Sequence, residues 1–397
     1  MNEAADASSS SPSKSSPPKQ GPLSDLRVLD LSTVLAGPGC ARHLGDFGAD
    51  VIKVERPGVG DTARNLGWRD DDGETFFFKG ANRNKRFVQL DLRSDVGREN
   101  LLRLVEHSDV LVENMRPGKL DALGLGLDVL HQRRPSLVVV RVTAFGQEGP
   151  YAHRPGFATL AEAMSGFAAL NGDADGPPTL PPIALTDEVT GLAAAFAAMI
   201  AVHSGVGQVV DANLLESMIQ LMGPLPSLWM KAGLLQPRLG SGLPYSIPRG
   251  AYETADGKWM AISTSADSVA ARIMELVGLG GDPRVGTVAD RMEHRVLVET
   301  RVAAWVAERS LAEALAAIEA ADAAAAQVYD MEALTSDPHI KARKSFVDVD
   351  GYPMPDVIAR LSATPGSVRA NAKAVGSDSA AIFEEFGLEG SPPSATD

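Results

Sequence analysis

Short apolar runs that alternate with helical patterns organise the first part of the chain. Between residues 26 and 146, near-continuous apolar runs predict buried strands at 27–31, 50–55, 87–92, 109–113 and 136–142. Residues 96–107 and 128–134 repeat their apolar positions with the period of a helix. Strands and helices in this order form right-handed βαβ units. The pattern therefore predicts an α/β fold with a Rossmann-like parallel sheet.

The pattern changes after this region. Helices are predicted at residues 159–170 and 186–203, and the second opens with a Thr and two acidic residues. A hairpin at 250–263 and helices at about 266–279, 295–309 and 311–324 predict a smaller α+β domain. We therefore expect a large domain at residues 22–223, a linker and small domain at 224–330, and a return to the large domain at 331–389.

The two ends of the chain differ in composition from the rest. Residues 1–21 are rich in Ser, Pro, Ala and Lys, and residues 390–397 are similar. Segments of this kind bury too little apolar surface to order themselves. We therefore expect a disordered tail at each end.

Charge and cysteine content narrow the function classes. The 37 Lys and Arg residues against 51 Asp and Glu residues give a formal net charge of −14, which disfavours nucleic acid or an anionic membrane as the main partner. Cys40, the single cysteine, excludes an internal disulfide and a cysteine-based metal cluster. Polar residues interrupt every long apolar run, and the N-terminus lacks the order of a signal peptide. We expect no membrane-spanning helix and a cytoplasmic location.

An acidic turn at residues 171–178, Asn-Gly-Asp-Ala-Asp-Gly-Pro-Pro, is one candidate for chemistry. Gly176 permits tight backbone geometry and the two following prolines restrict it, so the turn can aim the Asp175 carboxylate in one direction. A carboxylate held in this way can attack an acyl group. Turns of this composition are also ordinary solvated loops. On these residues alone, both interpretations stay open.

Segments that follow the predicted strands contain groups that suit an anionic ligand. Residues 35–40, Leu-Ala-Gly-Pro-Gly-Cys, lie between a strand and a helix, where small residues let a ligand approach the backbone. Arg56 follows the strand at 50–55, and a guanidinium there can stack on a base or pair with a phosphate. Residues 82–93 include four basic side chains. Residues 35–40 do not form GxGxxG, so no dinucleotide fingerprint is predicted there.

Together these segments resemble the class III coenzyme A-transferases, the CaiB–BaiF family, which includes formyl-CoA transferase and, more distantly, α-methylacyl-CoA racemase. The resemblance extends from about residue 23 to 387 and includes residues 36–38, 47–61, 84–86, 113–118 and 146–150. Residues 47–55, Phe-Gly-Ala-Asp-Val-Ile-Lys-Val-Glu, are its most characteristic part. It implies a Rossmann-like large domain, a small domain and an interlocked homodimer.

The resemblance also implies a reaction and roles for individual residues. Asp175, before Gly-Pro-Pro, matches the nucleophile, and CoA contacts are implied for Val34, Leu35, Ala36, Arg56, Arg93, Asn114 and Met115. The partners would be an acyl-CoA and a carboxylic acid acceptor, with CoA as substrate, no metal and no permanently bound cofactor. CoA would pass from the acyl-CoA to the acid through a mixed anhydride and an aspartyl-CoA thioester.

Other carboxylates and other functions remain open. Asp173 is a competing nucleophile, and Glu162 is a possible active-site carboxylate. Asp187 matches an acid that a racemase would use for α-proton transfer, but the favoured interpretation is a first-turn acid that stabilises a helix N-terminus. A racemase would also need a His-Asp pair where this chain has Phe157-Ala158.

Two departures from the transferase pattern leave a non-catalytic CoA-binding protein as a further alternative. Leu35 occupies a position at which the transferases often have Gln. The glycine-rich loop that covers the transferase site is shortened to Gly240-Ser-Gly242.

Overall fold

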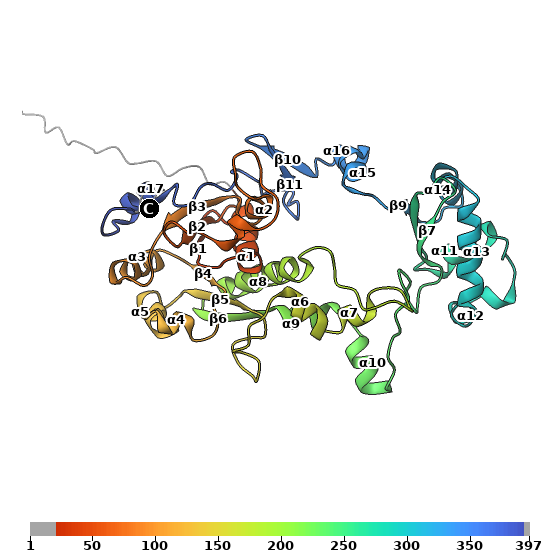
Figure 1. The fold of residues 1–397 in the computed structure, drawn as a ribbon, viewed down its shortest axis with the longest axis horizontal. Coiled ribbons are helices and arrows are strands. Elements are labelled where there is room, and N and C mark those ends of the chain that lie inside the picture. Colours follow the sequence, from red (N-terminus) through yellow and green to blue (C-terminus); the bar gives the residue numbers. More distant parts are fainter. Residues whose placement is uncertain (1–20, 393–397) are drawn as a thin grey trace, which may run out of the picture.

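The computed structural model describes residues 21–392, so most of the tails predicted at 1–21 and 390–397 lies outside the described residues. The molecule is elongated (Figure 1). A large parallel sheet with its helices lies at one end, and a smaller group of helices and strands lies at the other.

A six-stranded parallel sheet forms the centre of the larger part. Its order is β3-β2-β1-β4-β5-β6, and every neighbouring pair is parallel. The strands are β1 (Arg27–Asp30), β2 (Asp50–Glu55), β3 (Lys85–Gln89), β4 (Val110–Glu113), β5 (Val138–Thr143) and β6 (Gln208–Asn213). The α/β class and the Rossmann-like sheet are therefore confirmed. The strand order reverses between β1 and β4, where such sheets bind ligands.

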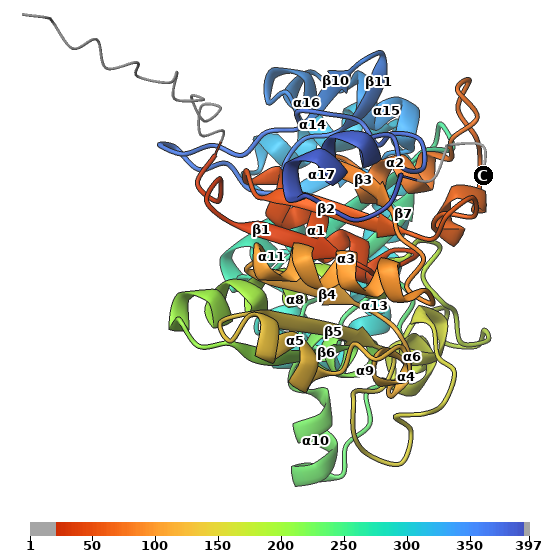
Figure 2. The same cartoon turned by 90° about the vertical axis from the view of Figure 1, so that its left-hand side faces the viewer.

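The two faces of the sheet bury alternate residues of each strand. Val28 and Val110 belong to the core on one face, which is covered by α1 (Ala36–Asp46), α8 (Leu185–Ser204) and α9 (Leu214–Leu221). Leu29 and Leu111 belong to the core on the opposite face, which is covered by α3 (Asp95–Glu106), α5 (Leu127–Arg133) and α17 (Ser379–Phe386). Figure 2 views the molecule from the side of α3, α5 and α17.

Helix α8 is, among the described residues, the one helix long and apolar enough to cross a membrane, with a mean hydropathy of 1.5 over an 18-residue window. The sequence predicts no such helix, because polar residues interrupt the run. In the structure, α8 packs against α1 more extensively than any other two elements pack together. Ala194 and Ala198 are fully buried in that core. One face of this long apolar helix is therefore part of the hydrophobic core, and 39% of the window is buried.

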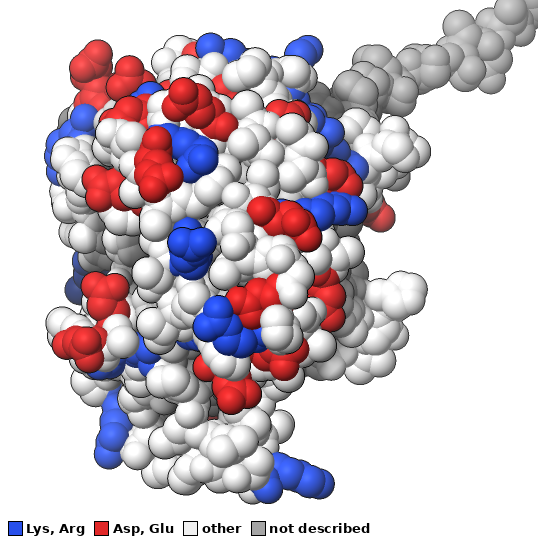
Figure 3. All heavy atoms as spheres, turned by 90° about the vertical axis from the view of Figure 1, so that its right-hand side faces the viewer, with Lys and Arg blue, Asp and Glu red and all other residues white. Residues whose placement is uncertain are grey.

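Residues 247–327 build a second hydrophobic core. Strands β7 (Arg249–Glu253), β8 (Trp259–Ser263) and β9 (Ala325–Gln327) form an antiparallel sheet. Its helices are α11 (Asp267–Leu276), α12 (Val288–Glu293), α13 (Arg295–Ala307) and α14 (Leu311–Ala320). On the face of the described chain that this part presents in Figure 3, basic and acidic side chains are interspersed.

The chain then returns to the parallel sheet. After α15 (Met331–Ser336) and α16 (Pro338–Ala342), strands β10 (Phe346–Val349) and β11 (Tyr352–Pro355) form a hairpin. Arg83 donates to the Pro355 carbonyl, and Asn84 donates to the Ser367 carbonyl at 3.0 Å. The remaining short helices are η1 (Thr62–Asn65), α2 (Phe76–Asn82), α4 (Lys119–Ala122), α6 (Ala158–Met164), α7 (Phe167–Leu170), α10 (Leu225–Ala232) and η2 (Pro283–Val285).

Three elements differ from the sequence predictions. The helix predicted at 159–170 is split into α6 and α7, because Gly166 adopts a left-handed conformation with φ of 92°. The strand predicted at 87–92 lies instead at 85–89, where it pairs with β2. The apolar pattern does not predict β6, which is an edge strand with Gln, Asp and Asn among its residues.

Candidate active site

Two cavities open at the carboxyl edge of the parallel sheet. The central cavity, about 500 Å³, is lined by the loops after β1, β4 and β5 and by the starts of α6 and α8. The strand-end cavity, about 510 Å³, lies over the ends of β1, β2 and β3. Thr33 and Met115 line both. The cavities therefore meet at the β1–β4 switch, where the strand order predicts a ligand.

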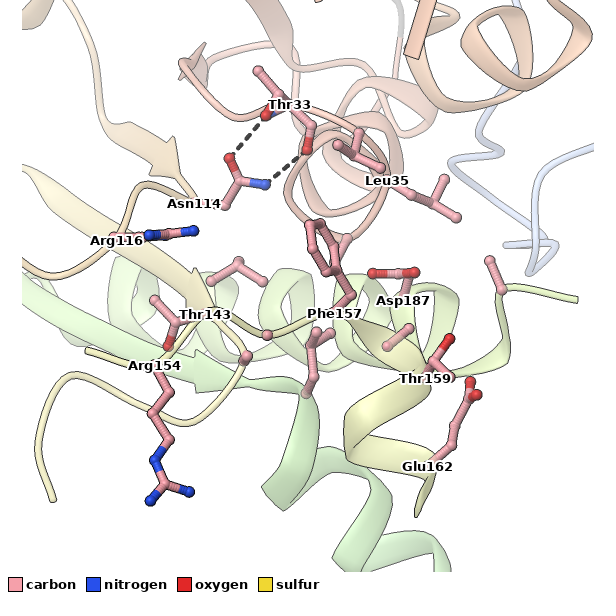
Figure 4. A pocket seen from close by; sticks show the side chains of 18 of the residues that line it. Thr33, Leu35, Asn114, Arg116, Thr143, Arg154, Phe157, Thr159, Glu162 and Asp187 are labelled. Atoms are coloured by element: carbon pink, nitrogen blue, oxygen red, sulfur yellow. Dashed lines mark hydrogen bonds between the residues drawn. The ribbon is translucent and has the colours of Figure 1, made fainter. Parts of the chain in front are cut away.

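The loop between β1 and α1 lies where the cavities meet and is held by two side chains. Asn114 accepts a hydrogen bond from the Thr33 N–H at 2.9 Å and donates one to the Thr33 carbonyl at 2.7 Å (Figure 4). Asp61 accepts from the Val34 N–H at 3.0 Å. Val34 has φ of 70°, which is a genuine outlier for a β-branched residue. The loop is thus held in a strained conformation.

Buried ion pairs lie beneath this loop. The Lys53 ammonium contacts Asp61 at 2.8 Å and Asp30 at 3.6 Å, and all three side chains are completely buried. Lys53 also donates to the Ser32 carbonyl. Burial alone would lower the pKa of Lys53, but Asp30, Asp61 and Glu55 raise it above its usual value. The ammonium therefore stays charged inside the protein.

Two carboxylates on helices line the central cavity. Asp187 lies in the first turn of α8, and Glu162 lies in α6 (Figure 4). Burial, and then the negative charges of Glu162 and Glu188, raise the pKa of Asp187 from 3.8 to about 6. A carboxylate of this pKa is more basic than a solvated one, yet it is mostly ionised at neutral pH. Asp187 therefore has the properties of a nucleophile or a proton acceptor.

Two arginines line the same cavity. Arg116 lies beside Asn114 in Figure 4, and Arg154 stacks on the Tyr151 ring at 3.8 Å. Within residues 21–392, neither guanidinium forms an ion pair with a carboxylate. In an acidic chain, two such guanidinium groups at one cavity favour an anionic ligand.

The residues predicted to contact CoA fall into two groups around these cavities. Val34, Leu35, Ala36, Asn114 and Met115 line the central cavity. The strand-end cavity contains the remaining two, Arg56 and Arg93. The sequence prediction therefore selects residues that the fold brings together. The Asn114 side chain, however, forms its hydrogen bonds with the Thr33 backbone.

Asp175 lies apart from these residues. It is exposed in the loop between α7 and α8, and it lines neither cavity. Arg238 holds the turn by donating to the Asp173 carbonyl at 3.2 Å and to the Gly176 carbonyl at 2.7 Å. The Gly240 N–H donates to the Gly172 carbonyl at 3.2 Å, so the short glycine loop rests on this turn. Asp175 as nucleophile stays a prediction, and the geometry favours Asp187 over it.

The positions at which a racemase would need its His-Asp pair also line the central cavity. They are Phe157 and Ala158, which have no group able to transfer a proton. Asp187 therefore has no histidine or aspartate opposite it at these positions.

Sequence reasoning missed Lys53, Asp61, Arg116 and Arg154. Lys53 carries the clearest signal, since a lysine in the middle of the apolar run Val-Ile-Lys-Val requires a buried acidic partner. Asp61 is that partner, eight residues along the chain. Arg116 and Arg154 have no comparable signal, because lone arginines in loops are usually solvated.

Comparison with known proteins identifies the family. Residues 23–379 match CoA-transferase family III. The chain belongs to this family. Succinyl-CoA–D-citramalate CoA-transferase of Chloroflexus aurantiacus is 38% identical over 382 residues, 93% of this chain and 94% of that protein. Succinate–glutarate CoA-transferase of Agrobacterium fabrum is 33% identical over 357 residues, 86% of this chain and 89% of that protein.

Solved structures of the family share this fold. A CAIB/BAIF family protein from Brucella suis matches with a TM-score of 0.83 and 30% identity, over 92% of this chain and 100% of that chain. The protein is thus a family III CoA-transferase, an enzyme of acyl-CoA metabolism. This finding confirms the resemblance to the CaiB–BaiF family and removes the alternative of a non-catalytic protein.

Proposed function

We propose that this CoA-transferase moves CoA from succinyl-CoA, or a similar dicarboxylic acyl-CoA, to a second carboxylic acid. One relative is named for succinyl-CoA and D-citramalate, and another for succinate and glutarate. Succinate, D-citramalate and glutarate are all dicarboxylic acids. Arg116 supports the same class, because its guanidinium lies beside Asn114 at the central cavity and offers a partner for the distal carboxylate of the acyl group (Figure 4).

We propose Asp187 as the nucleophile. Its carboxylate oxygen attacks the thioester carbonyl, the C–S bond breaks, and CoA leaves as the thiolate while a mixed anhydride forms. The thiolate then attacks the aspartyl carbonyl, so the donor acid leaves and an aspartyl-CoA thioester remains. The acceptor carboxylate attacks this thioester, and the same two steps run in reverse. Each step exchanges one activated acyl group for another, so no oxidant or reductant is consumed.

The first turn of α1 would stabilise the oxyanions formed in these steps. No side chain caps this helix at Leu35, and Leu35 and Ala36 line the central cavity with Asp187. Uncapped N–H groups at a helix start are suited to developing negative charge. The nucleotide end of CoA would occupy the strand-end cavity, where Arg56 offers a partner for a phosphate.

The observation that carries the proposal is the position of Asp187, with its raised pKa, among the residues expected to bind CoA. Trapping tests it directly. The enzyme is incubated with succinyl-CoA, treated with borohydride or hydroxylamine, and digested, and the modified peptide is located by mass spectrometry. We expect modification at Asp187 in the wild-type enzyme and in Asp175→Asn, and none in Asp187→Asn.

Each other outcome has a definite meaning. Modification at Asp175 would establish the sequence prediction and overturn the role of Asp187. Deuterium uptake at the α-carbon without modification of either residue would indicate racemase chemistry.

Butyryl-CoA tests the acyl class, because it has the chain length of succinyl-CoA without the distal carboxylate. We expect its kcat/KM to be at least about tenfold lower, the cost of one lost charge-assisted hydrogen bond. Equal use of the two thioesters would contradict a dicarboxylic donor.

A further inference from the structure

The conformation of Val34 is costly and has a visible cause. Val34 has φ of 70°, a region that β-branched residues rarely enter. Its N–H donates to Asp61 Oδ1 at 3.0 Å, and this hydrogen bond requires the observed orientation of the peptide. Such strain persists only where the surroundings over-determine it, and it concentrates at functional sites.

Asp61 is built into the protein as an anchor. It is 1% exposed, and its second carboxylate oxygen accepts from Lys53 at 2.8 Å. Its own N–H donates to Glu55 Oε1 at 2.9 Å, and Oδ1 also accepts from the Ala63 N–H at 2.9 Å. Neither Asp61 nor Lys53 lines the central cavity, so neither needs to touch the acyl group. Both border the strand-end cavity, where their side chains are buried and paired with each other.

The anchored loop lies where its conformation matters for the reaction. Thr33 lines both cavities, and Val34, Leu35 and Ala36 line the central one opposite Asp187. A CoA molecule that spans the two cavities must pass this loop. A change of φ at Val34 would redirect the following peptide and the start of α1.

We propose that Asp61 is a positioning residue for CoA transfer: paired with Lys53, it holds Val34 in the left-handed conformation and so fixes the loop at the junction of the two cavities. This inference rests on the proposed function, because it assumes that CoA spans both cavities. If the Lys53–Asp61 pair only stabilised the sheet edge, the effect of Asp61→Asn on KM would not depend on whether residue 34 favours positive φ.

The test combines a change in the anchor with a change in backbone preference. Asp61→Asn cannot serve both Val34 and Lys53, because the amide has one acceptor oxygen. We expect its KM for succinyl-CoA to rise about tenfold, with a smaller change in kcat, as for loss of a hydrogen bond to a charged group. Glycine adopts positive φ without penalty, so Asp61→Asn combined with Val34→Gly should recover KM to within about threefold of wild type.

The matched control is Asp61→Asn combined with Val34→Ala. Alanine removes the same branched side chain but still disfavours positive φ, so we expect no recovery. Recovery by alanine equal to that by glycine, no recovery by either, or a wild-type KM in Asp61→Asn would each overturn the proposal.

A second variant covers the case in which Asp61→Asn does not fold. Val34→Pro leaves the buried pair intact, but proline fixes φ near −65° and has no N–H. We expect CoA binding, measured by calorimetry, to weaken by at least about tenfold while circular dichroism is unchanged. Wild-type CoA affinity in Val34→Pro would overturn the proposal.

Failure of the positioning role and failure of the proposed function have different signatures. The CoA affinity of the two double variants is therefore also measured by calorimetry. If the wild-type enzyme forms no covalent adduct at Asp187 but glycine, and not alanine, at position 34 restores this affinity, then the proposed nucleophile is wrong and the positioning role of Asp61 is correct. If the adduct forms at Asp187 and glycine does not restore the affinity, then Asp187 is the nucleophile and the positioning role of Asp61 is wrong.

Discussion

The Glu162 carboxylate accepts a hydrogen bond of 2.9 Å from the hydroxyl of Thr186, the residue directly before Asp187. This bond ties α6 to the start of α8, and it places the buried Glu162 carboxylate near the half-buried carboxylate of Asp187 in the central cavity. Two carboxylates at one site oppose each other's ionisation, which is part of the reason for the raised pKa of Asp187. The arrangement has consequences for activity and for stability.

The first consequence is a pH limit on activity. With the pKa of Asp187 near 6, the nucleophile becomes protonated below that pH, so kcat/KM should fall tenfold per pH unit on the acid side. Glu162→Gln removes the negative charge that raises the pKa of Asp187 more than that of Glu188 does, and it should move this limit to lower pH. Glu188→Gln is the matched control, because its charge is the smaller cause and is paired with Arg42 at 3.0 Å. An acid limb unchanged by Glu162→Gln would contradict the coupling.

The second consequence is a stability cost at neutral pH. The pKa of Asp187 is higher in the folded protein than the usual 3.8, so the folded state binds the proton more tightly. Its contribution to stability is therefore present below about pH 4 and is lost as the pH rises through 6. We expect Asp187→Asn to raise the free energy of unfolding by about 1–3 kcal/mol at pH 8, while it abolishes transfer.

Chemical denaturation at two pH values measures this effect. At pH 4 the folded-state carboxyl is already neutral, so Asp187→Asn should match the wild type there. A stabilisation of equal size at pH 4 and pH 8 would show that ionisation of Asp187 is not its cause.

A third prediction separates the two arginines of the strand-end cavity. Arg93 is paired with Asp91 at 3.0 Å, and its side chain is 74% exposed, whereas Arg56 has no ion-pair partner among the described residues. Arg56→Ala should weaken CoA binding about tenfold, and the difference should shrink at high salt. Arg93→Ala should change the affinity by less than about threefold. Calorimetry at low and high salt gives both values, and equal losses would contradict the assignment.

The sequence predicts the parallel sheet but not its strand β6, because the apolar pattern depends on how many faces of a strand are buried. Strands β1, β2, β4 and β5 are buried on both faces, so apolar residues dominate them, interrupted in β2 by Lys53 and in β5 by Arg141. Strand β6 pairs on one side only, and half-exposed positions accept Gln and Asp. The pattern of the sequence therefore reveals central strands better than edge strands.

The candidate site shows the same limit. Local rules indicate that the turn around Asp175 is stiff, but they do not indicate which cavity the turn faces. Asp187 reads in sequence as an ordinary first-turn acid of a helix. Its raised pKa depends first on burial and then on the charge of Glu162, a residue of another helix, so only the packing of α6 on α8 reveals it.

The exposed face of α8 bears on the interlocked homodimer, which the family resemblance implies and which stays a prediction. Leu192, Phe196 and Ile200 form an exposed apolar stripe on this helix, and Phe196 is 69% exposed. Apolar stripes of this kind mark contacts with a partner. We expect light scattering to give twice the chain mass for the wild type and a monomer, or an aggregate, for Phe196→Lys. Val296→Lys, at a 79% exposed position on α13, is the control and should keep the dimer mass. A monomeric wild-type protein at micromolar concentration, or a Phe196→Lys dimer of unchanged stability, would exclude this helix face as the contact.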